Sequence, residues 1–244
     1  MPNRELNLEN NIQQFVSQLE HLYGPELTSI TLYGSAAGVD YNMDRSDLNF
    51  LIIHKKINPD RMKQVQKWVK NWQQRRIAAP LMLDSQLLES SVAVFPMEFL
   101  EMKEQHETLY GADPFSKLEI PFQHLKLQCE QELKGKRLRL QTAYLETQGK
   151  TASMEAMLIG ATKSFGVIMR TLLRLKSIQP AREFLETLNQ IEELFTAELD
   201  GFRQTHQIRM GFQQLDEDEA QKVFVQFWHD VSTLTDKAEA IFRT

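Results

Sequence analysis

The residues best placed to do chemistry lie between positions 30 and 53, where two apolar runs flank a Gly-Ser pair and an acidic residue. The first run leads into Gly34 and Ser35, and Asp47 and Asn49 open the second. A glycine lets the backbone approach a bulky anion, and a serine hydroxyl can donate a hydrogen bond to it. Carboxylate and amide oxygens are ligands for hard divalent cations. This order of residues predicts a site for a phosphate group and a metal ion.

The apolar runs at 30–32 and 47–53 have the composition of strands, so we expect two strands joined through the Gly-Ser turn. Successive side chains of a strand point to opposite faces of the sheet. Asp47 and Asn49 then share one face, while the apolar residues beside them pack on the other. Both oxygen-bearing side chains are therefore expected to face the turn.

The stretch resembles the signature of the nucleotidyltransferase superfamily of the polymerase-beta type, which is a strand, Gly-Ser, a loop, and Asp-x-Asp on the next strand. Here eleven residues separate Ser35 from Asp47, and Asn49 stands where the family has its second aspartate. Two-metal phosphoryl chemistry needs anionic ligands to hold two cations about 3.5 to 4 Å apart. An amide oxygen is neutral and holds a divalent ion more weakly. Asn49 is therefore the residue that bears on whether catalysis is retained.

The resemblance also implies a third carboxylate on a later strand. We expect the apolar run 92–102 to be that strand, with Glu98 as the one charge in its middle. Because a charge inside an apolar strand is rarely left unpaired, Glu98 is the candidate third ligand, or a general base beside an acceptor hydroxyl. A helix cap or an ion pair is the alternative role. The run from Phe95 to Gly111 is also similar to the strand, helix and Leu-Tyr-Gly ending of bacterial aminoglycoside-adenylyltransferase-like proteins.

Helix and strand patterns alternate in the first half of the chain. Apolar residues recur at helical spacing near 8–23 and 59–76, and a further apolar run, APLML, precedes Asp84. Strands connected through helices on their faces give a mixed sheet. We therefore expect an α/β nucleotidyltransferase-like domain at 1–115.

Strand patterns end after the proline-containing segment 112–122, which indicates a linker. Helices with apolar stripes are expected from there on, with breaks at Gly149, at Pro180 and around Gly201 to Gly211. The expected helices are 122–148, 152–177, 181–200 and 216–242. Four helices of this length predict an up-and-down bundle at 120–244. The fold class is therefore α+β, an α/β domain with a mixed sheet followed by an all-α helical bundle.

In the bundle the side chains suited to a nucleotide are basic. Lys163, Arg170 and Arg174 share one face of helix 152–177. In the resembled enzymes a cation from the helical domain meets the triphosphate, which makes Lys163 the first candidate and Arg170 the second. A solvated helix face is the alternative. A second basic cluster is expected only to be exposed to solvent; it comprises Lys134, Lys136, Arg137 and Arg139.

The net charge and the residue composition limit which binding partners and which cellular compartment the sequence indicates. The net charge of -5 does not indicate a nucleic-acid partner. The sequence contains no run of 18 apolar residues, so it does not indicate a membrane partner either. The single cysteine, Cys129, rules out an internal disulfide framework and fits a reducing cytoplasm. The histidines lack the spacing of a zinc site. We therefore expect a cytoplasmic protein, and the sequence leaves room for a homo-oligomer.

Three functions fit these residues. The first is Mg²⁺-dependent transfer of a nucleotidyl group from a nucleoside triphosphate such as ATP to the hydroxyl of a small molecule that the sequence does not identify. There Gly34 and Ser35 would hold the phosphates, while Asp47, Asn49 and Glu98 would hold two ions, or one ion only. The second is a nucleotide-binding pseudoenzyme, and the third is an interaction protein similar to antitoxins of this superfamily.

Overall fold

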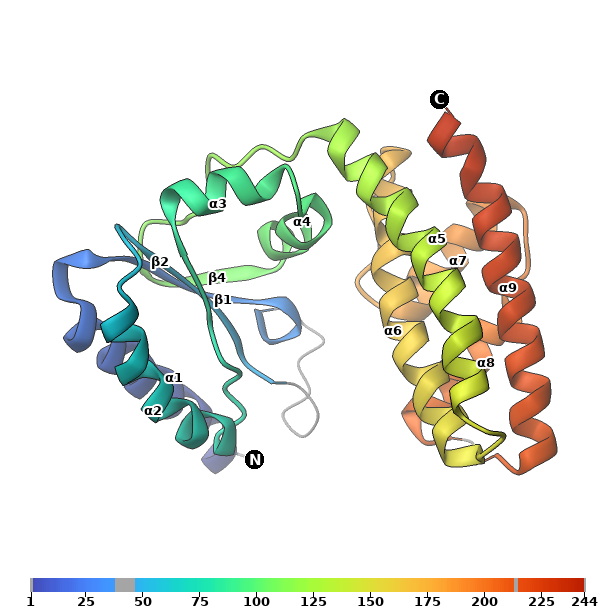
Figure 1. Cartoon of the computed structure of the whole chain (residues 1–244), viewed down its shortest axis with the longest axis horizontal. Coiled ribbons are helices and arrows are strands. Elements are labelled where there is room, and N and C mark those ends of the chain that lie inside the picture. The colour runs from blue at the N-terminus through green and yellow to red at the C-terminus, as the bar shows by residue number, and fades with distance from the viewer. Residues whose placement is uncertain (1, 38–46, 213–214, 244) are drawn as a thin grey trace. The chain divides into compact units, whose positions relative to one another are not determined.

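The computed structural model describes residues 2–37, 47–212 and 215–243. The chain divides into two compact units, Met1–Pro121 and Phe122–Thr244. The first unit contains a sheet covered by helices, and the described part of the second contains only helices and their connections (Figure 1). This arrangement of elements confirms the predicted α+β class.

The N-terminal unit is built on a four-stranded mixed sheet in the order β3-β2-β1-β4. Strand β1 pairs antiparallel with β2 on one side and with β4 on the other, whereas β2 and β3 are parallel. Parallel neighbours need a crossover, and helix α2 (Pro59–Gln74) supplies it. The strands are β1 (Leu27–Tyr33), β2 (Asn49–His54), β3 (Leu81–Asp84) and β4 (His106–Gly111).

Helices cover both faces of the sheet (Figure 1). Helix α1 (Pro2–Tyr23) and α2 lie on one face, and α3 (Ser85–Val92) and α4 (Pro96–Glu104) lie on the other. Alternate residues of β2 accordingly enter two separate apolar cores. Phe50 packs with Phe15 and Trp72 under α1 and α2, while Leu51 packs on the α3 and α4 side.

The expectation of a strand at 92–102 is wrong, because most of this run is helix α4. Its buried residues, Pro96, Met97 and Phe99, lie on one side of a helix and do not alternate as in a strand. Proline is favoured in the first turn of a helix, and an acidic residue there is stabilised by the helix dipole. Glu98 occupies that first turn and is exposed.

Strand β4 follows α4 directly and was not predicted from the sequence. It ends at Gly111, which has a φ of 75°. A Cβ atom at this position would lie 2.0 Å from the carbonyl oxygen of Thr28. Gly111 therefore permits both the left-handed turn at the end of β4 and the close approach of β4 to β1.

The helical unit contains five described helices, one more than expected. They are α5 (Phe122–Glu146), α6 (Thr151–Leu175), α7 (Phe184–Phe195), α8 (Asp200–Met210) and α9 (Glu217–Arg243). The predicted break around Gly201 to Gly211 is wrong, because the two glycines bracket a helix. A Cβ at Gly201 would lie 2.5 Å from the Phe227 backbone nitrogen, so this glycine allows α8 to cross α9 closely. Gly211 adopts a φ of 80° and ends α8 in the left-handed conformation.

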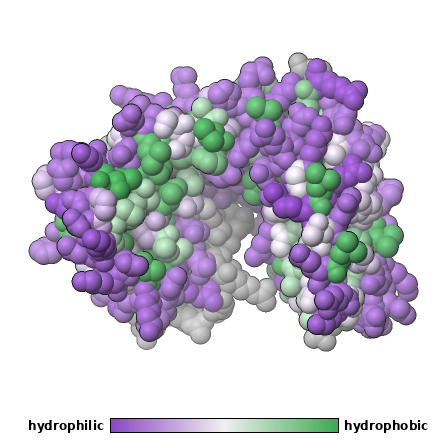
Figure 2. All heavy atoms as spheres, viewed as in Figure 1, coloured by the Kyte–Doolittle hydropathy of each residue, from purple (hydrophilic) through white to green (hydrophobic). Residues whose placement is uncertain are grey.

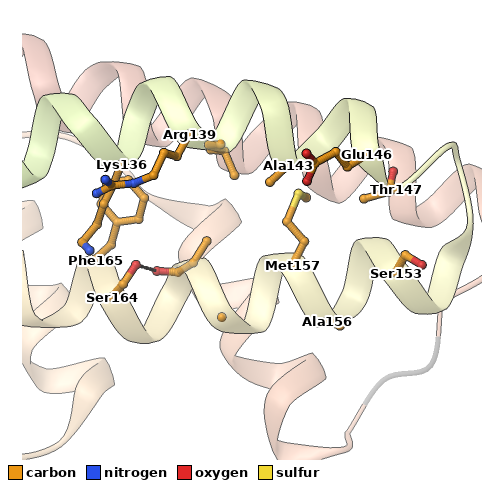
Figure 3. Close-up of a pocket in the computed structure, with 13 residues that line it drawn as sticks. Lys136, Arg139, Ala143, Glu146, Thr147, Ser153, Ala156, Met157, Ser164 and Phe165 are labelled. Atoms are coloured by element: carbon orange, nitrogen blue, oxygen red, sulfur yellow. Dashed lines mark hydrogen bonds between the residues drawn. The ribbon is translucent and has the colours of Figure 1, made fainter.

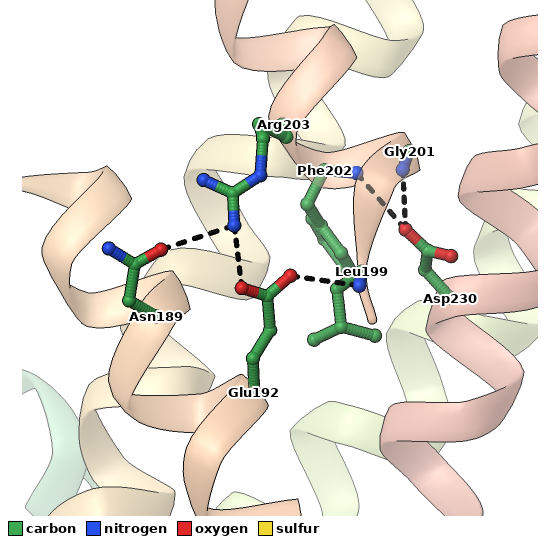
Figure 4. A network of polar contacts seen from close by, with 7 residues as sticks. All are labelled: Asn189, Glu192, Leu199, Gly201, Phe202, Arg203 and Asp230. Carbon is green, nitrogen blue, oxygen red and sulfur yellow. Dashed lines mark hydrogen bonds and ion pairs between the residues drawn. The ribbon is translucent and has the colours of Figure 1, made fainter. Parts of the chain in front are cut away.

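A buried carboxylate fixes the start of α8 (Figure 4). Asp230 of α9 is fully buried, and its Oδ2 accepts hydrogen bonds from the backbone N–H groups of Gly201 at 2.6 Å and Phe202 at 3.2 Å. Its Oδ1 accepts a third from Gln226. Burial raises the pKa of Asp230 to about 6, against these three hydrogen bonds, which favour the ionised form.

Helix α6 is the central helix of this unit. It has the length and the apolar composition of a membrane span, yet half of its most apolar window is buried inside the structure, as in the core helix of a bundle. Most of the surface visible in Figure 2 is hydrophilic, with a broader apolar area on the N-terminal unit and smaller apolar groups on the helical unit. Large exposed apolar side chains do occur on α5, namely Phe122, Leu127, Leu138 and Leu145.

Replacing Gly111 by alanine should destabilise the N-terminal unit strongly. Gly24 is the control, because it also has a positive φ, of 50°, but a Cβ there would meet nothing within 4 Å. Gly24→Ala should cost about 1 to 2 kcal/mol for the left-handed backbone alone, and Gly111→Ala at least about 3 kcal/mol, because it adds a backbone clash. Urea unfolding followed by tryptophan fluorescence measures both variants. Equal effects would contradict the close-approach argument.

The stability of the helical unit should fall as pH rises through about 6. The raised pKa of Asp230 means that the folded state binds its proton more tightly than the unfolded state does. The contribution of this proton to the unfolding free energy is about 3 kcal/mol. It is fully present below about pH 4 and is lost above about pH 6. Asp230→Asn keeps the size and one acceptor but cannot ionise. The difference in unfolding free energy between the parent and this variant should therefore change across the window, and a constant difference would contradict the assignment.

Candidate functional site

The Gly-Ser turn lies at the end of β1. Gly34 begins a short 3-10 turn (Gly34–Ala37) with a φ of 77°, a conformation that favours glycine. Its N–H group donates a hydrogen bond of 2.9 Å to the carbonyl oxygen of Gln105, the residue that ends α4. The amide of Gly34 is thus used within the fold. Any phosphate at this turn would have to be bound by later groups, of which the Ser35 hydroxyl is the one predicted from the sequence.

Asn49 lies beside the turn. It is the first residue of β2 and pairs with Tyr33, the last residue of β1. A Cβ built on Gly34 would lie 3.9 Å from Asn49 Nδ2, and the same Nδ2 lies 3.5 Å from the carbonyl oxygen of Asp47. Asp47 is exposed just before the strand. The structure therefore brings Asn49 to the turn, with Asp47 next to it. Residues 38–46, which include Asp44, Arg45 and Ser46, lie outside the described residues.

The strands on either side of this position carry no carboxylate at the level of Asn49. On the β3 side, Leu48 forms a bridge to Ile77, and the N–H of Ala78 donates a hydrogen bond of 3.0 Å to the Leu48 carbonyl oxygen. The residues beside Asn49 on this side are therefore the small apolar residues that follow Ile77. On the β4 side, Tyr33 pairs with His106. Burial raises the pKa of Tyr33, so its hydroxyl stays neutral. Asn49, Tyr33 and His106 therefore form a row of polar groups across the sheet.

The ring of His106 is held by two acceptors. Its Nδ1 lies 2.9 Å from the carbonyl oxygen of Lys103, and its Nε2 lies 3.2 Å from the Asp113 carboxylate. The same carboxylate oxygen accepts the N–H of Phe115, whose ring contacts the imidazole. These contacts tie β4 to the segment that follows it. His106 is therefore a positioning group in the fold at this end of the sheet.

Glu98 is not on the strand that the resemblance implied. The part of α4 that meets the turn is Gln105, which follows Glu98 by seven positions, or about 10 Å along a helix. Among the described residues, no group of three or more His, Cys, Asp or Glu side chains is arranged to hold a metal. Within the described ranges, the predicted oxygen donors nearest the turn are Asp47, whose backbone carbonyl lies 3.5 Å from Asn49 Nδ2, and the Asn49 amide. These two donors could serve one cation that is also bound by ligand oxygens.

The predicted cations of the helical unit lie on α6. Lys163 is exposed, and Arg170 is half-buried next to Gly166, where a Cβ would lie 3.8 Å from the Arg170 guanidinium and 3.4 Å from Phe184. Lys163, Arg170 and Arg174 share a face of this helix, as the spacing indicated. Their assignment to a nucleotide stays a prediction.

In the second basic cluster Lys134 and Arg139 are exposed as expected, whereas Lys136 and Arg137 are half-buried. Lys136 and Arg139 line a pocket of about 490 Å³ between α5 and α6 (Figure 3). The other two members form ion pairs away from it, Lys134 with Glu130 and Arg137 with Asp236. The sequence did carry a signal for this pocket. Small residues recur at helical spacing on the first half of α6, and they are Ser153, Ala156, Gly160, Ala161 and Ser164.

Comparison with known proteins supports the fold. No protein-family model and no curated protein matches the chain. Among solved structures, the chain is similar to spectinomycin adenyltransferase AAD(9) from Enterococcus faecialis, solved with ATP and spectinomycin, with a TM-score of 0.58 and 13% identity over 93% of this chain and 98% of that one. A nucleotidyltransferase-like protein from Exiguobacterium sibiricum 255-15 matches with a TM-score of 0.40 and 13% identity, over 91% of this chain and 73% of that one. The chain therefore has a nucleotidyltransferase-type fold.

Proposed function

We propose that the N-terminal unit binds a nucleoside triphosphate at the Gly34–Ser35 turn, with ATP as the first candidate. The observation that carries this proposal is the position of Asn49 beside Gly34, with Asp47 next to it, at the shared end of two paired strands. The similar adenyltransferase was solved with ATP, which supports the choice of ligand. The Ser35 hydroxyl would donate to a phosphate oxygen, and Asp47 with the Asn49 amide oxygen would hold one Mg²⁺. That ion would supply positive charge against the triphosphate.

Nucleotidyl transfer is the step that this donor set supports poorly. The second ion of a two-metal clamp stabilises the attacking or the leaving oxygen, and each 1.36 kcal/mol lost from that stabilisation slows the reaction about tenfold. Of the three expected ligands, one is an amide and one, Glu98, lies on a helix. We therefore propose a nucleotide-binding pseudoenzyme. Nucleotide binding requires fewer anionic protein ligands than nucleotidyl transfer does, because the triphosphate supplies several oxygen ligands of its own.

An active transferase is the second candidate, favoured by the similarity to an adenyltransferase over nearly the whole chain. In that case Asp47 and Asn49 would act with a single ion, and the acceptor would be the hydroxyl of a small molecule. Lys163 and Arg170 would be the helical residues tested for triphosphate contacts. A cytoplasmic site of action fits the lone cysteine, Cys129, whose thiol pKa is raised by burial in the helical core, so that it is an unreactive packing residue.

Ser35→Ala should weaken triphosphate binding without unfolding the protein. A hydrogen bond to a charged group contributes roughly 1.5 to 3 kcal/mol, so the affinity should fall about tenfold or more. The measurement is calorimetric titration with ATP, GTP, CTP and UTP, with and without Mg²⁺. Ser90→Ala is the matched control, because Ser90 is an exposed serine on α3 of the same unit.

Lys163→Ala tests the helical cation in the same titration, with Lys134→Ala as its control. Lys134 is an exposed lysine of α5 paired with Glu130. A parent protein that binds none of the four triphosphates would overturn the proposal and leave the interaction-protein function. Binding that is unchanged by Ser35→Ala would place the phosphates elsewhere than this turn.

Asn49→Asp should restore a second anionic ligand and so raise Mg²⁺ affinity and any nucleotidyl transfer. Transfer is measured with radiolabelled triphosphates against a panel of aminoglycosides and other hydroxyl acceptors. We expect the parent to be inactive or at least about tenfold slower than the variant. A parent that transfers faster than Asn49→Asp would show that the amide belongs to a working single-ion mechanism, and the pseudoenzyme proposal would fail while triphosphate binding stood.

A further inference from the structure

The pocket between α5 and α6 is an open groove on the helical unit, lined only by residues of these two helices and by Thr147 at the end of α5. Its volume of about 490 Å³ falls in the range of small-molecule sites. Leu140 of α5 and Phe165 of α6 are buried at its floor, and Met157 adds a flexible apolar wall. Gly160 is exposed, and a Cβ built on it would meet nothing within 4 Å, so this glycine faces the open space of the groove.

The two ends of the pocket carry opposite charges (Figure 3). Lys136 and Arg139 lie at one end with Ser164, and Glu146 lies at the other with Thr147. Lys136 and Glu146 are ten positions apart on α5, which corresponds to about 15 Å. The pocket is therefore elongated along the helices and is electrically asymmetric.

The basic end keeps an excess of positive charge. Lys136 Nζ lies 3.0 Å and Arg139 Nη2 lies 3.5 Å from the same oxygen of Glu132, so one carboxylate is shared by two cations. The Arg139 side chain is 68% exposed, which leaves its guanidinium accessible to a ligand. An acidic group entering this end would form charge-assisted hydrogen bonds. The same group at the Glu146 end would be repelled.

We propose that this pocket binds a linear organic anion with a single acidic group. The acidic group contacts Lys136 and Arg139, and the apolar chain runs along Ala143, Met157 and Gly160. The far end of the ligand is neutral or positively charged, because it lies near Glu146.

Three probes of equal chain length test the charge pattern by calorimetry on the full chain: decanoate, decanedioate and decylamine. Decanoate should bind, and decanedioate about tenfold more weakly, because its second carboxylate would meet Glu146. Decylamine can bind only in the reverse orientation, with its ammonium group at the Glu146 end, so Glu146→Gln should weaken its binding while Arg139→Gln should not. Absence of decanoate binding, or equal affinity for all three probes, would overturn the proposal.

Charge variants then locate the acidic group. Arg139→Gln and Lys136→Gln should each weaken decanoate binding about fivefold or more, while Lys134→Gln, which changes a lysine outside the pocket, should leave it unchanged. Glu146→Gln should leave decanoate affinity nearly constant and remove the discrimination against decanedioate. An equal loss in Lys134→Gln would indicate nonspecific attraction of the anion by the surface, and would also overturn the proposal.

Filling the cavity gives an independent test. Gly160→Leu places a side chain in the empty space and should abolish decanoate binding. Gly160→Ala is its control, because a small side chain leaves room and an alanine is favoured over glycine inside a helix, so its melting temperature should rise. Folding is checked by circular dichroism. A folded Gly160→Leu variant that binds decanoate as the parent does would exclude this pocket, and the charge variants decide the question if that variant does not fold.

Discussion

The pairing of β1 on both of its edges is the constraint on which the N-terminal unit depends. Because β1 pairs antiparallel with β2 and with β4, its last residue, Tyr33, brings Asn49 and His106 into one row across the sheet. The hydrogen bond from Gly34 to Gln105 then ties the turn after β1 to the end of α4. The site is therefore positioned by strand register, and the turn itself is held by the backbone of a helix that precedes β4.

The charge balance at this turn distinguishes binding from transfer. A triphosphate supplies oxygen ligands of its own, so under the proposed function an ion at Asp47 and Asn49 would retain several contacts even though one protein ligand is neutral. Transfer makes a further demand, because charge develops on attacking and leaving oxygens that only a second ion or its equivalent would meet. Among the described residues, Asn49 has small apolar residues after Ile77 on one side and the tethered imidazole of His106 on the other, with Glu107 as the next residue of β4.

The sequence predicted β1 and β2 from apolar runs on either side of the Gly-Ser turn, and helix α2 from helical spacing and a proline in its first turn. Asn49 lies beside that turn. The run at 92–102 was misassigned because short apolar segments fit both a buried strand and a buried helix, and only tertiary packing decides. Helix α8 was missed for a related reason: a glycine needed for close contact with Phe227 resembles a glycine that breaks a helix. The pocket of α5 and α6 depends on two helices facing each other, which no single window of sequence contains.

The glycines show how one residue type serves unrelated physical demands. Gly34 and Gly111 both adopt a left-handed backbone, yet only Gly111 also lies against a neighbouring strand, where a Cβ would meet the Thr28 carbonyl. Gly201 has an ordinary helical backbone, and it is required because α9 approaches it so closely that a Cβ would clash. Gly160 meets neither demand, because its backbone is helical and the space in front of it is empty. In a helix interior such a glycine costs up to about 1 kcal/mol relative to alanine. Gly160 is exposed and lines the groove between α5 and α6, so no packing contact within the helical unit requires a glycine there.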